Sequence, residues 1–414
     1  MLLAAYGFVR GDFVVLLGAL FAMGAQSAFL GPIKYGVLPE LVPADELVMS
    51  NALVEMGTFV AILLGTIGGA VLVLMEGGPA YVAFVVVLLA FIGLVAALRM
   101  PTAGRADPSV KVQWDLVRPT LEVLRITGRS RPVLLSVLGI SWFWFLGACF
   151  LSIIPIYVNQ TLGAAPDVTT LLLTLFCVGI ALGSMLTEKI SGKNLELGLV
   201  PFGSFGMSVF ALDLYFVGAH PLGVGEATRT IGALLEAPWG LRLAADFLGI
   251  AIFGGFFTVP LYTLVQQRSE PSERARVIAG NNVLNALYMT AGSVLLGLSL
   301  RAGVEVPVLF AGVALLNVLA ALYIYSVVPE FLLRFLAFLL SRVMYRLRLE
   351  GHENVPETGG VVLICNHVSF IDWLVIGGSI RRPTRFVMDH RIAKTPLVSM
   401  LFRHAKTIPI APQK

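Results

Sequence analysis

The sequence predicts a polytopic α-helical membrane protein that continues into the start of a soluble α/β region. Hydrophobic residues make up 57% of the 414 residues, and charged residues make up only 13%, against about 25% in an average soluble domain. Nine apolar stretches are long enough to cross a bilayer. After residue 350 the pattern changes to turn residues, an apolar run and a helix start. As a description of the whole chain, this composition excludes soluble enzymes, disordered proteins and disulfide scaffolds.

Each predicted span is an apolar stretch of about 20 residues, the length that crosses a bilayer. The spans lie near residues 12–31, 52–75, 80–98, 133–157, 170–188, 197–218, 245–267, 277–299 and 305–328. Residues 1–9 are apolar but too short to cross, and we expect them to be the end of a helix whose beginning is missing. They have no charged n-region, which disfavours a signal peptide.

Basic residues alternate between the loops and predict the orientation. One alternate set of loops carries 17 Lys and Arg residues, and the other set carries 4. Cytoplasmic loops of membrane proteins carry the basic excess. We therefore expect the basic set, and everything after residue 328, to lie in the cytoplasm.

The longest hydrophilic gap, residues 101–131, divides the spans, and six of them follow it. Two six-helix halves joined by a long cytoplasmic loop is the layout of the major facilitator superfamily, whose halves are structural repeats. This resemblance implies that about ten of twelve helices are present in residues 1–328 and that the N-terminus is incomplete.

Polar side chains at membrane depth are candidates for a substrate path, because they are costly there and are kept for a function. The candidates are Glu55, Lys34, Asn281 and Asn282. Other interpretations stay open. Lys34 and Asp213 lie near helix ends and can reach interfacial water, and the asparagines, Asn285 among them, can pair helices. Glu55 lies one turn inside its span and is the hardest to explain structurally.

Four segments resemble bacterial lysophospholipid transporters of the major facilitator superfamily. They are residues 31–39 (GPIKYGVLP), 51–55 (NALVE), 260–269 (PLYTLVQQRS) and 274–282 (RARVIAGNN). The resemblance covers residues 1–328. It implies flipping of lysophospholipid from the outer to the inner leaflet of the bacterial inner (cell) membrane.

Small residues and cysteines inside the spans favour packing roles. Gly65 and Gly69 form a G-x-x-x-G pattern, and other glycines lie in later spans at positions 254, 255 and 292. The cysteines, at positions 149, 177 and 365, are odd in number and widely spaced. We therefore expect no disulfide framework and no metal site, and nothing in the sequence indicates a nucleic-acid partner.

Residues 329–350 form a linker with an amphipathic stretch. Residues 331–348 are apolar but include Arg334, Arg342, Arg346 and Arg348. This pattern predicts a helix lying on the cytoplasmic membrane face. A plain linker helix is the alternative.

A soluble α/β region is predicted from residue 351 onward. Residues 351–360 are rich in turn residues, and residues 361–365 (VVLIC) form an apolar run typical of a buried strand. Ser369 and Asp372 have the spacing of a capping box, so a helix should begin there. His367 then lies at a strand-to-helix junction. A histidine oriented by a carboxylate can act as a general base, whereas the alternative is that Asp372 only caps the helix.

This region resembles the glycerophospholipid (1-acylglycerol-3-phosphate type) acyltransferases, and the resemblance covers residues 351–414. The matching segments are residues 351–356 (GHENVP), the N-H-x4-D block from Asn366 to Asp372, and residues 385–388, 394–397 and 408–410. The resemblance implies that His367 is the catalytic base and Asp372 its partner. It also implies acyl-ACP or acyl-CoA as co-substrate and no other cofactor. The family's phosphate-binding arginine and F-P-E-G block are expected beyond residue 414. His352, His390 and His404 match no family motif and are expected at the surface.

The order of the two regions resembles known bacterial fusions of a lysophospholipid transporter with an acyltransferase. It implies a fragment, incomplete at both ends and inactive by itself in acyl transfer. The whole protein would import lysophospholipid and re-acylate it at the cytoplasmic face, possible partners being lysophospholipid and acyl carrier protein. The alternative is a major facilitator transporter of another small solute with a vestigial, non-catalytic C-terminal module.

Overall fold

The fold is given by a computed structural model that describes most of the chain. It covers residues 1–414 except 101–114, 116, 192–194, 218–219, 223–229, 328, 352–353, 357–358, 370, 381, 383, 394–398, 400–404 and 412–414. The central part of the predicted 101–131 loop, and the predicted motif at residues 394–397, therefore lie outside the described residues.

All nine predicted spans are confirmed as helices long and apolar enough to cross a membrane. They are α2 (Phe13–Leu41), α3 (Leu47–Leu74), α4 (Gly78–Leu98), α6 (Arg131–Ile156), α7 (Pro166–Ser191), α8 (Leu199–Val217), α10 (Gly240–Arg268), α11 (Arg274–Arg301) and α12 (Val306–Val327). The first residues form the short helix α1 (Leu2–Arg10), and a π-helical turn, η1 (Tyr157–Leu162), prolongs α6. Most helices exceed their predicted spans, because membrane helices continue past the apolar core into the interface.

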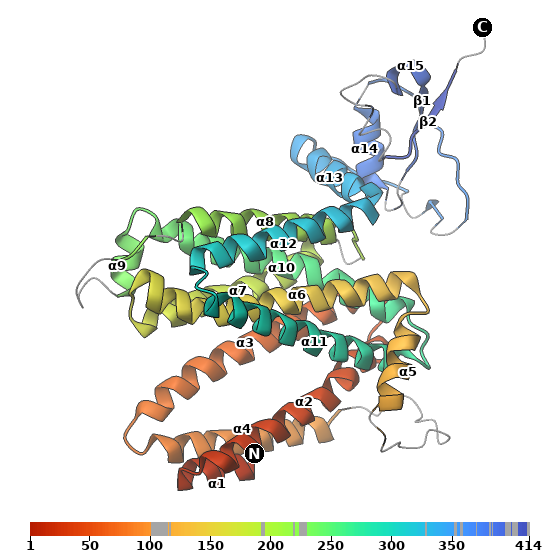
Figure 1. Ribbon diagram of the computed structural model, residues 1–414. Coiled ribbons are helices and arrows are strands. Elements are labelled where there is room, and N and C mark those ends of the chain that lie inside the picture. Colours follow the sequence, from red (N-terminus) through yellow and green to blue (C-terminus); the bar gives the residue numbers. More distant parts are fainter. Residues whose placement is uncertain are drawn as a thin grey trace.

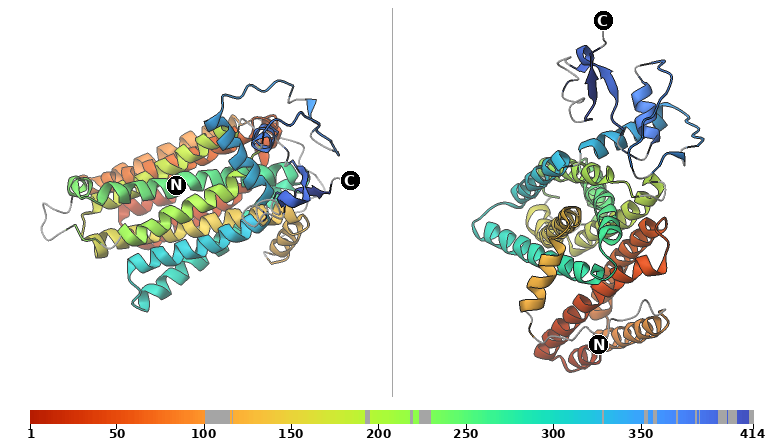
Figure 2. Two further views of the ribbon diagram at one scale, coloured as in Figure 1. Left: turned by 90° about the horizontal axis from the view of Figure 1, so that it is seen from above. Right: turned by 90° about the vertical axis from the view of Figure 1, so that its right-hand side faces the viewer.

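The membrane helices run side by side, with connecting segments at two ends. Helices α5 (Val117–Thr127) and α13 (Pro329–Met344) lie at one end, and α9 (Ile231–Glu236) lies at the other (Figure 1). Seen along the helices, α1–α4 form a group beside the ring made by α6–α12 (right view of Figure 2). Helices α6 and α10 are mostly buried, whereas α2, α3 and α4 expose most of their apolar side chains, as lipid-facing helices do.

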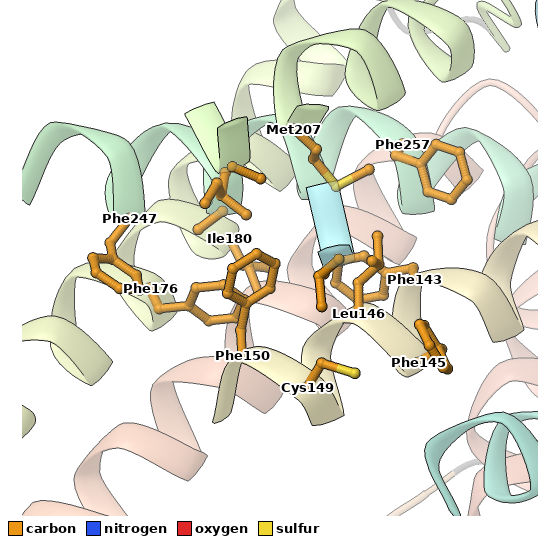
Figure 3. Close-up of a cluster of buried hydrophobic side chains, with 14 of the residues drawn as sticks. Phe143, Phe145, Leu146, Cys149, Phe150, Phe176, Ile180, Met207, Phe247 and Phe257 are labelled. Atoms are coloured by element: carbon orange, nitrogen blue, oxygen red, sulfur yellow. The ribbon is translucent and has the colours of Figure 1, made fainter. Parts of the chain in front are cut away.

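Aromatic residues fill the core of the α6–α12 ring. Phe150 lies near Phe176 and Phe310, with ring centroids 6.1 and 6.2 Å apart, and Tyr157 meets Phe310 edge-on at 5.2 Å. Figure 3 shows this cluster, to which α6, α7, α8 and α10 contribute. Such packing supports helix association in lipid, where the hydrophobic effect between helices is weak.

Ion pairs confirm which loops share an end. Arg129, between α5 and α6, contacts Glu273, just before α11, at 2.7 Å, and Arg276 lies 3.5 Å from Glu122 of α5. These residues belong to loops that the charge alternation assigns to one side. The pairing of Arg242 with Asp213 lies at the opposite end, near α9. The alternation of loops is therefore present in the fold.

The C-terminal elements are small. They comprise α14 (Asp372–Ser379), α15 (His390–Ala393) and the parallel strands β1 (Val387–Asp389) and β2 (Ile408–Ile410), in which Val387 pairs with Ile408. The prediction of a buried strand at residues 361–365 is wrong in this structure. Val362 and Ile364 are 85% and 92% exposed, because no described strand pairs with the run and no described element covers its faces.

The amphipathic stretch does form a helix, but it ends earlier than predicted. Helix α13 stops at Met344, and residues 345–350 have no regular structure. Phe335 on its inner face is fully buried, while Val343 and Met344 at its end are exposed. Contact of this helix with the membrane surface stays a prediction.

Glycines allow close helix approach at some of the predicted positions. A Cβ atom at Gly255 of α10 would lie 2.4 Å from the backbone N of Ser184 in α7, and one at Gly292 would lie 3.1 Å from Cys149 Sγ. In contrast, nothing lies within 4 Å of a Cβ at Gly65 or Gly69. The packing interpretation therefore holds for the later spans but not for the G-x-x-x-G pair of α3 in this structure.

We expect Gly255→Val to destabilise the membrane domain, because the added side chain must push α7 and α10 apart. Overpacking of this kind costs about 1–3 kcal/mol, which thermal unfolding in detergent measures as a lower Tm. Gly297→Val is the matched control, since nothing lies within 4 Å of its Cβ position. Equal Tm values for the two variants would contradict this close approach.

Candidate functional site

The four predicted substrate-path residues lie along one seam between α2 and α3 on one side and α10 and α11 on the other. Lys34 comes from α2, Glu55 from α3, and Asn281 and Asn282 from α11. Lys34 and Glu55 are close enough to interact electrostatically. The seam therefore holds opposite charges at membrane depth, where each is costly unless it has a partner or a ligand.

Glu55 is held by a tyrosine that the sequence analysis missed. Its side chain is 1% exposed, and its Oε1 accepts a hydrogen bond of 2.7 Å from the Tyr35 hydroxyl. The ammonium group of Lys34 donates to Thr58 Oγ1 at 3.3 Å and lies 4.6 Å from the centre of the Tyr35 ring. Tyr35 thus contacts both charged residues. The available signal was its position directly after Lys34 in the segment 31–39.

A second tyrosine, Tyr262 of α10, stacks on Tyr35 from the other side of the seam. The rings of Tyr35 and Tyr262 stack with centroids 4.5 Å apart and planes within 3°. Trp144 of α6 donates its indole N–H to the Tyr262 hydroxyl at 3.2 Å. The result is an aromatic wall beside the charged pair. Tyr262 also lies in a segment that carries the transporter resemblance.

An amide pair fixes α3 against α10. Asn51 Nδ2 donates to Gln266 Oε1 at 2.5 Å, and Gln266 Nε2 donates back to Asn51 Oδ1 at 3.0 Å. The same Nε2 donates to the backbone carbonyl of Tyr35 at 3.0 Å. Both side chains are at most 1% exposed, so these bonds satisfy groups that lipid could not. Both residues lie in the matched segments, but their pairing could not be read from them.

The asparagines of α11 differ in their surroundings. Asn281 is 1% exposed, and it lies beside the Tyr262 hydroxyl, but its amide N and O make no hydrogen bond of ordinary geometry. Asn282 packs against Gly31, where a Cβ would lie 2.4 Å from its Nδ2. Asn285 accepts a bond of 2.8 Å from Ser141 and is structural. Asn281 is thus the buried amide of this group that lacks a well-formed hydrogen bond.

The structure brings His367 and Asp372 together at the start of α14. The distance from His367 Nδ1 to Asp372 Oδ2 is 2.8 Å. The same oxygen accepts the backbone N–H groups of Val368 and Ser369 at 2.8 and 3.0 Å. The histidine side chain is 75% exposed. Its Nε2 is thus presented outward while Nδ1 is held.

The structure shows the bond to His367 but no capping box. The Asp372 carboxylate bonds the imidazole and accepts the N–H groups of Val368 and Ser369 in the loop before the helix. Helix α14 begins at Asp372 rather than at Ser369, and no side chain caps it. The N–H groups of Ser369 and Val368, and then His367, hold the pKa of Asp372 below its ordinary value. The carboxylate stays charged and can stabilise an imidazolium beside it.

The remaining candidates lie apart from this pair or outside the described residues. His390, on α15, lies 3.4 Å from the Asp389 carboxylate, and His352 and His404 are outside the described residues. Cys149 and Cys177 are buried and Cys365 is exposed, all as free thiols. Within the described ranges no three metal-binding side chains converge.

Comparison with known proteins matches both regions of the chain. Residues 1–235 match the model of the Major Facilitator Superfamily, and residues 346–414 match a model described as Acyltransferase. The chain is 30% identical over 302 residues to the lysophospholipid transporter LplT of Escherichia fergusonii, covering 70% of this chain and 68% of that protein. The corresponding proteins of Enterobacter sp. (strain 638) and Klebsiella pneumoniae are 30% and 29% identical over the same shares.

These matches agree with the nine membrane-length helices found among the described residues and with the separate C-terminal region of mixed helix and strand. The chain belongs to the major facilitator superfamily, and its membrane domain is followed by a region of the acyltransferase family.

Proposed function

We propose that this protein moves lysophospholipid from the outer to the inner leaflet of a bacterial inner membrane and re-acylates it at the cytoplasmic face. The observation that carries the proposal is the His367–Asp372 hydrogen bond, formed in an acyltransferase-family region that shares a chain with relatives of lysophospholipid transporters. The domain limits that we propose are residues 1–328 for transport, 329–350 for the linker and 351–414 for the acyltransferase part.

The seam suits a zwitterionic head group such as phosphoethanolamine. Lys34 can pair with the phosphate and Glu55 with the ammonium. Each would then replace its present contact, with Thr58 or Tyr35, by a contact with a charge on the lipid. The unpartnered amide of Asn281 can both donate and accept hydrogen bonds. The seam thus favours a phosphoethanolamine head group, and with the transporter resemblance we propose 2-acyl-glycerophosphoethanolamine as the substrate.

The histidine supports acyl transfer without a nucleophile from the protein. His367 Nε2 takes the proton of the free glycerol hydroxyl, and the oxygen attacks the carbonyl of an acyl thioester. The ester C–O bond forms, the C–S bond breaks, and the imidazolium returns the proton to the departing thiolate. Asp372 holds the imidazole orientation and stabilises its positive charge. Thioesters of acyl carrier protein and of coenzyme A both fit this step.

The orientation follows from the basic loops. The end that carries α5 and α13 is the end with the basic excess, so we place it in the cytoplasm. The acyltransferase region then lies where acyl thioesters are made.

Cys365 supplies a native test of this orientation, because it is exposed while Cys149 and Cys177 are buried. We expect a membrane-impermeant maleimide to label the protein in inside-out vesicles and not in spheroplasts. Ala302→Cys, made together with Cys365→Ser, is the control at the opposite end and should be labelled in spheroplasts. Labelling of native Cys365 from the outside would contradict the topology.

Glu55→Gln tests the head-group assignment. The amide oxygen can still accept from Tyr35, so the change removes mainly the charge. Uptake of lysophosphatidylethanolamine should fall roughly 10- to 100-fold, the equivalent of one lost charged hydrogen bond. Lysophosphatidylglycerol, which lacks an ammonium, should be affected much less. Lys34→Gln should lower uptake of both lipids, since both carry a phosphate.

Uptake is measured in proteoliposomes by the movement of labelled lipid to the inner leaflet. An equal loss for both lipids in Glu55→Gln would give Glu55 a structural role only. Normal uptake in both variants would place the lipid path elsewhere.

Substitution of the His–Asp pair tests the acyl-transfer step in the purified whole protein, completed downstream of residue 414. His367→Ala should lower acyl transfer about 10²- to 10⁴-fold and leave lipid uptake unchanged. Asp372→Asn can still accept the two backbone N–H bonds, but it removes the charge beside the imidazole. We therefore expect a slower reaction, because the imidazolium formed during acyl transfer is less stabilised.

The charge that Asp372→Asn removes is present in the wild type at neutral pH, because the pKa of Asp372 is lowered below its ordinary value of 3.8. Unchanged acylation in His367→Ala would show that this histidine is not the base. Unchanged acylation in Asp372→Asn would show that the charge beside the imidazole does not serve the reaction.

A further inference from the structure

Helix α13 is attached to the membrane domain by a largely buried ion pair. Arg334 of α13 pairs with Glu196, in the turn before α8, and their side chains are only 8% and 12% exposed. Glu196 is itself held by the Gly198 N–H at 3.0 Å. The contact therefore has a defined geometry rather than that of a loose surface pair.

Apolar packing surrounds this ion pair. Phe335, next to Arg334, is fully buried and forms a cluster with Leu199 and Phe256. Its ring also lies 5.4 Å from that of Phe202. A Cβ at Gly198 would lie 2.3 Å from the Cβ of Phe335, so α13 touches the backbone of this turn directly.

The same arginine reaches the acyltransferase region. Arg334 Nη1 donates to the backbone carbonyl of Ile380, the residue after α14, at 3.3 Å. Helix α14 also packs closely on α13, since a Cβ at Gly378 would lie 2.7 Å from the Ala337 carbonyl oxygen. One guanidinium thus joins the membrane domain to the helix that begins at Asp372.

The chemistry of this position requires arginine. Burial lowers the pKa of Arg334 to about 10, which leaves it charged near pH 7. A planar guanidinium can donate to two acceptors in different directions, which the ammonium of lysine does less well. A buried ion pair adds little net stability compared with apolar packing. The effect of the Arg334–Glu196 pair is instead to favour one arrangement of α13 and α14 on the membrane domain.

We propose that Arg334 is a positioning residue that latches α14 to the turn between α7 and α8 of the membrane domain. Through Asp372, the first residue of α14, the latch fixes the His367–Asp372 pair at one place on that domain. Lipid delivered to the inner leaflet is then acylated before it mixes with the rest of the leaflet. This last step rests on the proposed function, whereas the latch itself does not.

Hydrogen exchange of residues 372–380 tests the latch directly in the purified protein. We expect exchange to rise at least about tenfold in Arg334→Gln and in Glu196→Gln, with Arg334→Lys intermediate. The double substitution Arg334→Glu with Glu196→Arg should restore part of the protection against hydrogen exchange that is lost in Arg334→Glu alone. Arg342→Gln is the control, because Arg342 is on the same helix but exposed, over the ring of Phe338.

Exchange in Arg334→Gln equal to that in Arg342→Gln would overturn the latch. Arg334→Gln avoids the reversed charge, so a failure of Arg334→Glu to fold would not hide this result.

A two-pool assay tests the consequence for acylation. Deuterated lysophosphatidylethanolamine is placed in the outer leaflet of proteoliposomes, and the same lysolipid without label is placed in the inner leaflet. The acyl thioester is enclosed in the lumen. The wild type should draw product preferentially from the transported, deuterated pool. Arg334→Gln should lower this preference several-fold while uptake, and acylation of inner-leaflet lipid, both continue.

Wild-type product drawn from the two pools in proportion to their abundance would contradict preferential acylation. Absence of uptake in the wild type would instead contradict the proposed function, and the hydrogen-exchange result would still decide on the latch.

Discussion

The core of a bilayer contains no water, and this constraint determines where polar groups in this protein can lie. Buried polar side chains occur in several of the described membrane helices, and one group of them lies at the seam around Glu55. There Asn51 and Gln266 satisfy each other, and Tyr35 satisfies Glu55. The groups that hold α2 and α3 to α10 are thus the groups at which we propose that a charged lipid head binds. In this proposal, helix packing and transport share the same few hydrogen bonds.

Properties that are local in the sequence were predicted well. Span length and loop charge are set by short stretches, so all nine spans and the alternation of loops were found. The His367–Asp372 contact joins residues five positions apart. The Asn51–Gln266 pair joins residues more than 200 positions apart, and the tyrosine stack is similarly remote, so no local pattern revealed either. The apolar run at residues 361–365 has the hydrophobicity of a buried strand, but its sequence does not say which strand would pair with it. The run is exposed in the structure, so the predicted buried strand is wrong.

The C-terminal region shows how one carboxylate can serve fold and chemistry together. A single oxygen of Asp372 accepts two backbone N–H groups and faces the imidazole. The backbone bonds hold the loop before α14 around the carboxylate and lower the pKa of Asp372. Of the two alternatives that the sequence left open, the structure shows the bond to His367 and no side-chain cap on α14. Arg334 extends this link to the membrane domain, since it contacts both Glu196 and the end of α14.

The central claim is that one lipid passes from the transporter to the acyltransferase across the membrane. The most direct measurement places labelled lysophosphatidylethanolamine only in the outer leaflet of proteoliposomes with oriented protein, and seals the acyl thioester on the side that carries α13. We expect labelled diacyl lipid when the thioester is on that side and none when it is only on the opposite side. Product formed with the thioester only on the opposite side, or no product although uptake and acylation each occur separately, would contradict it.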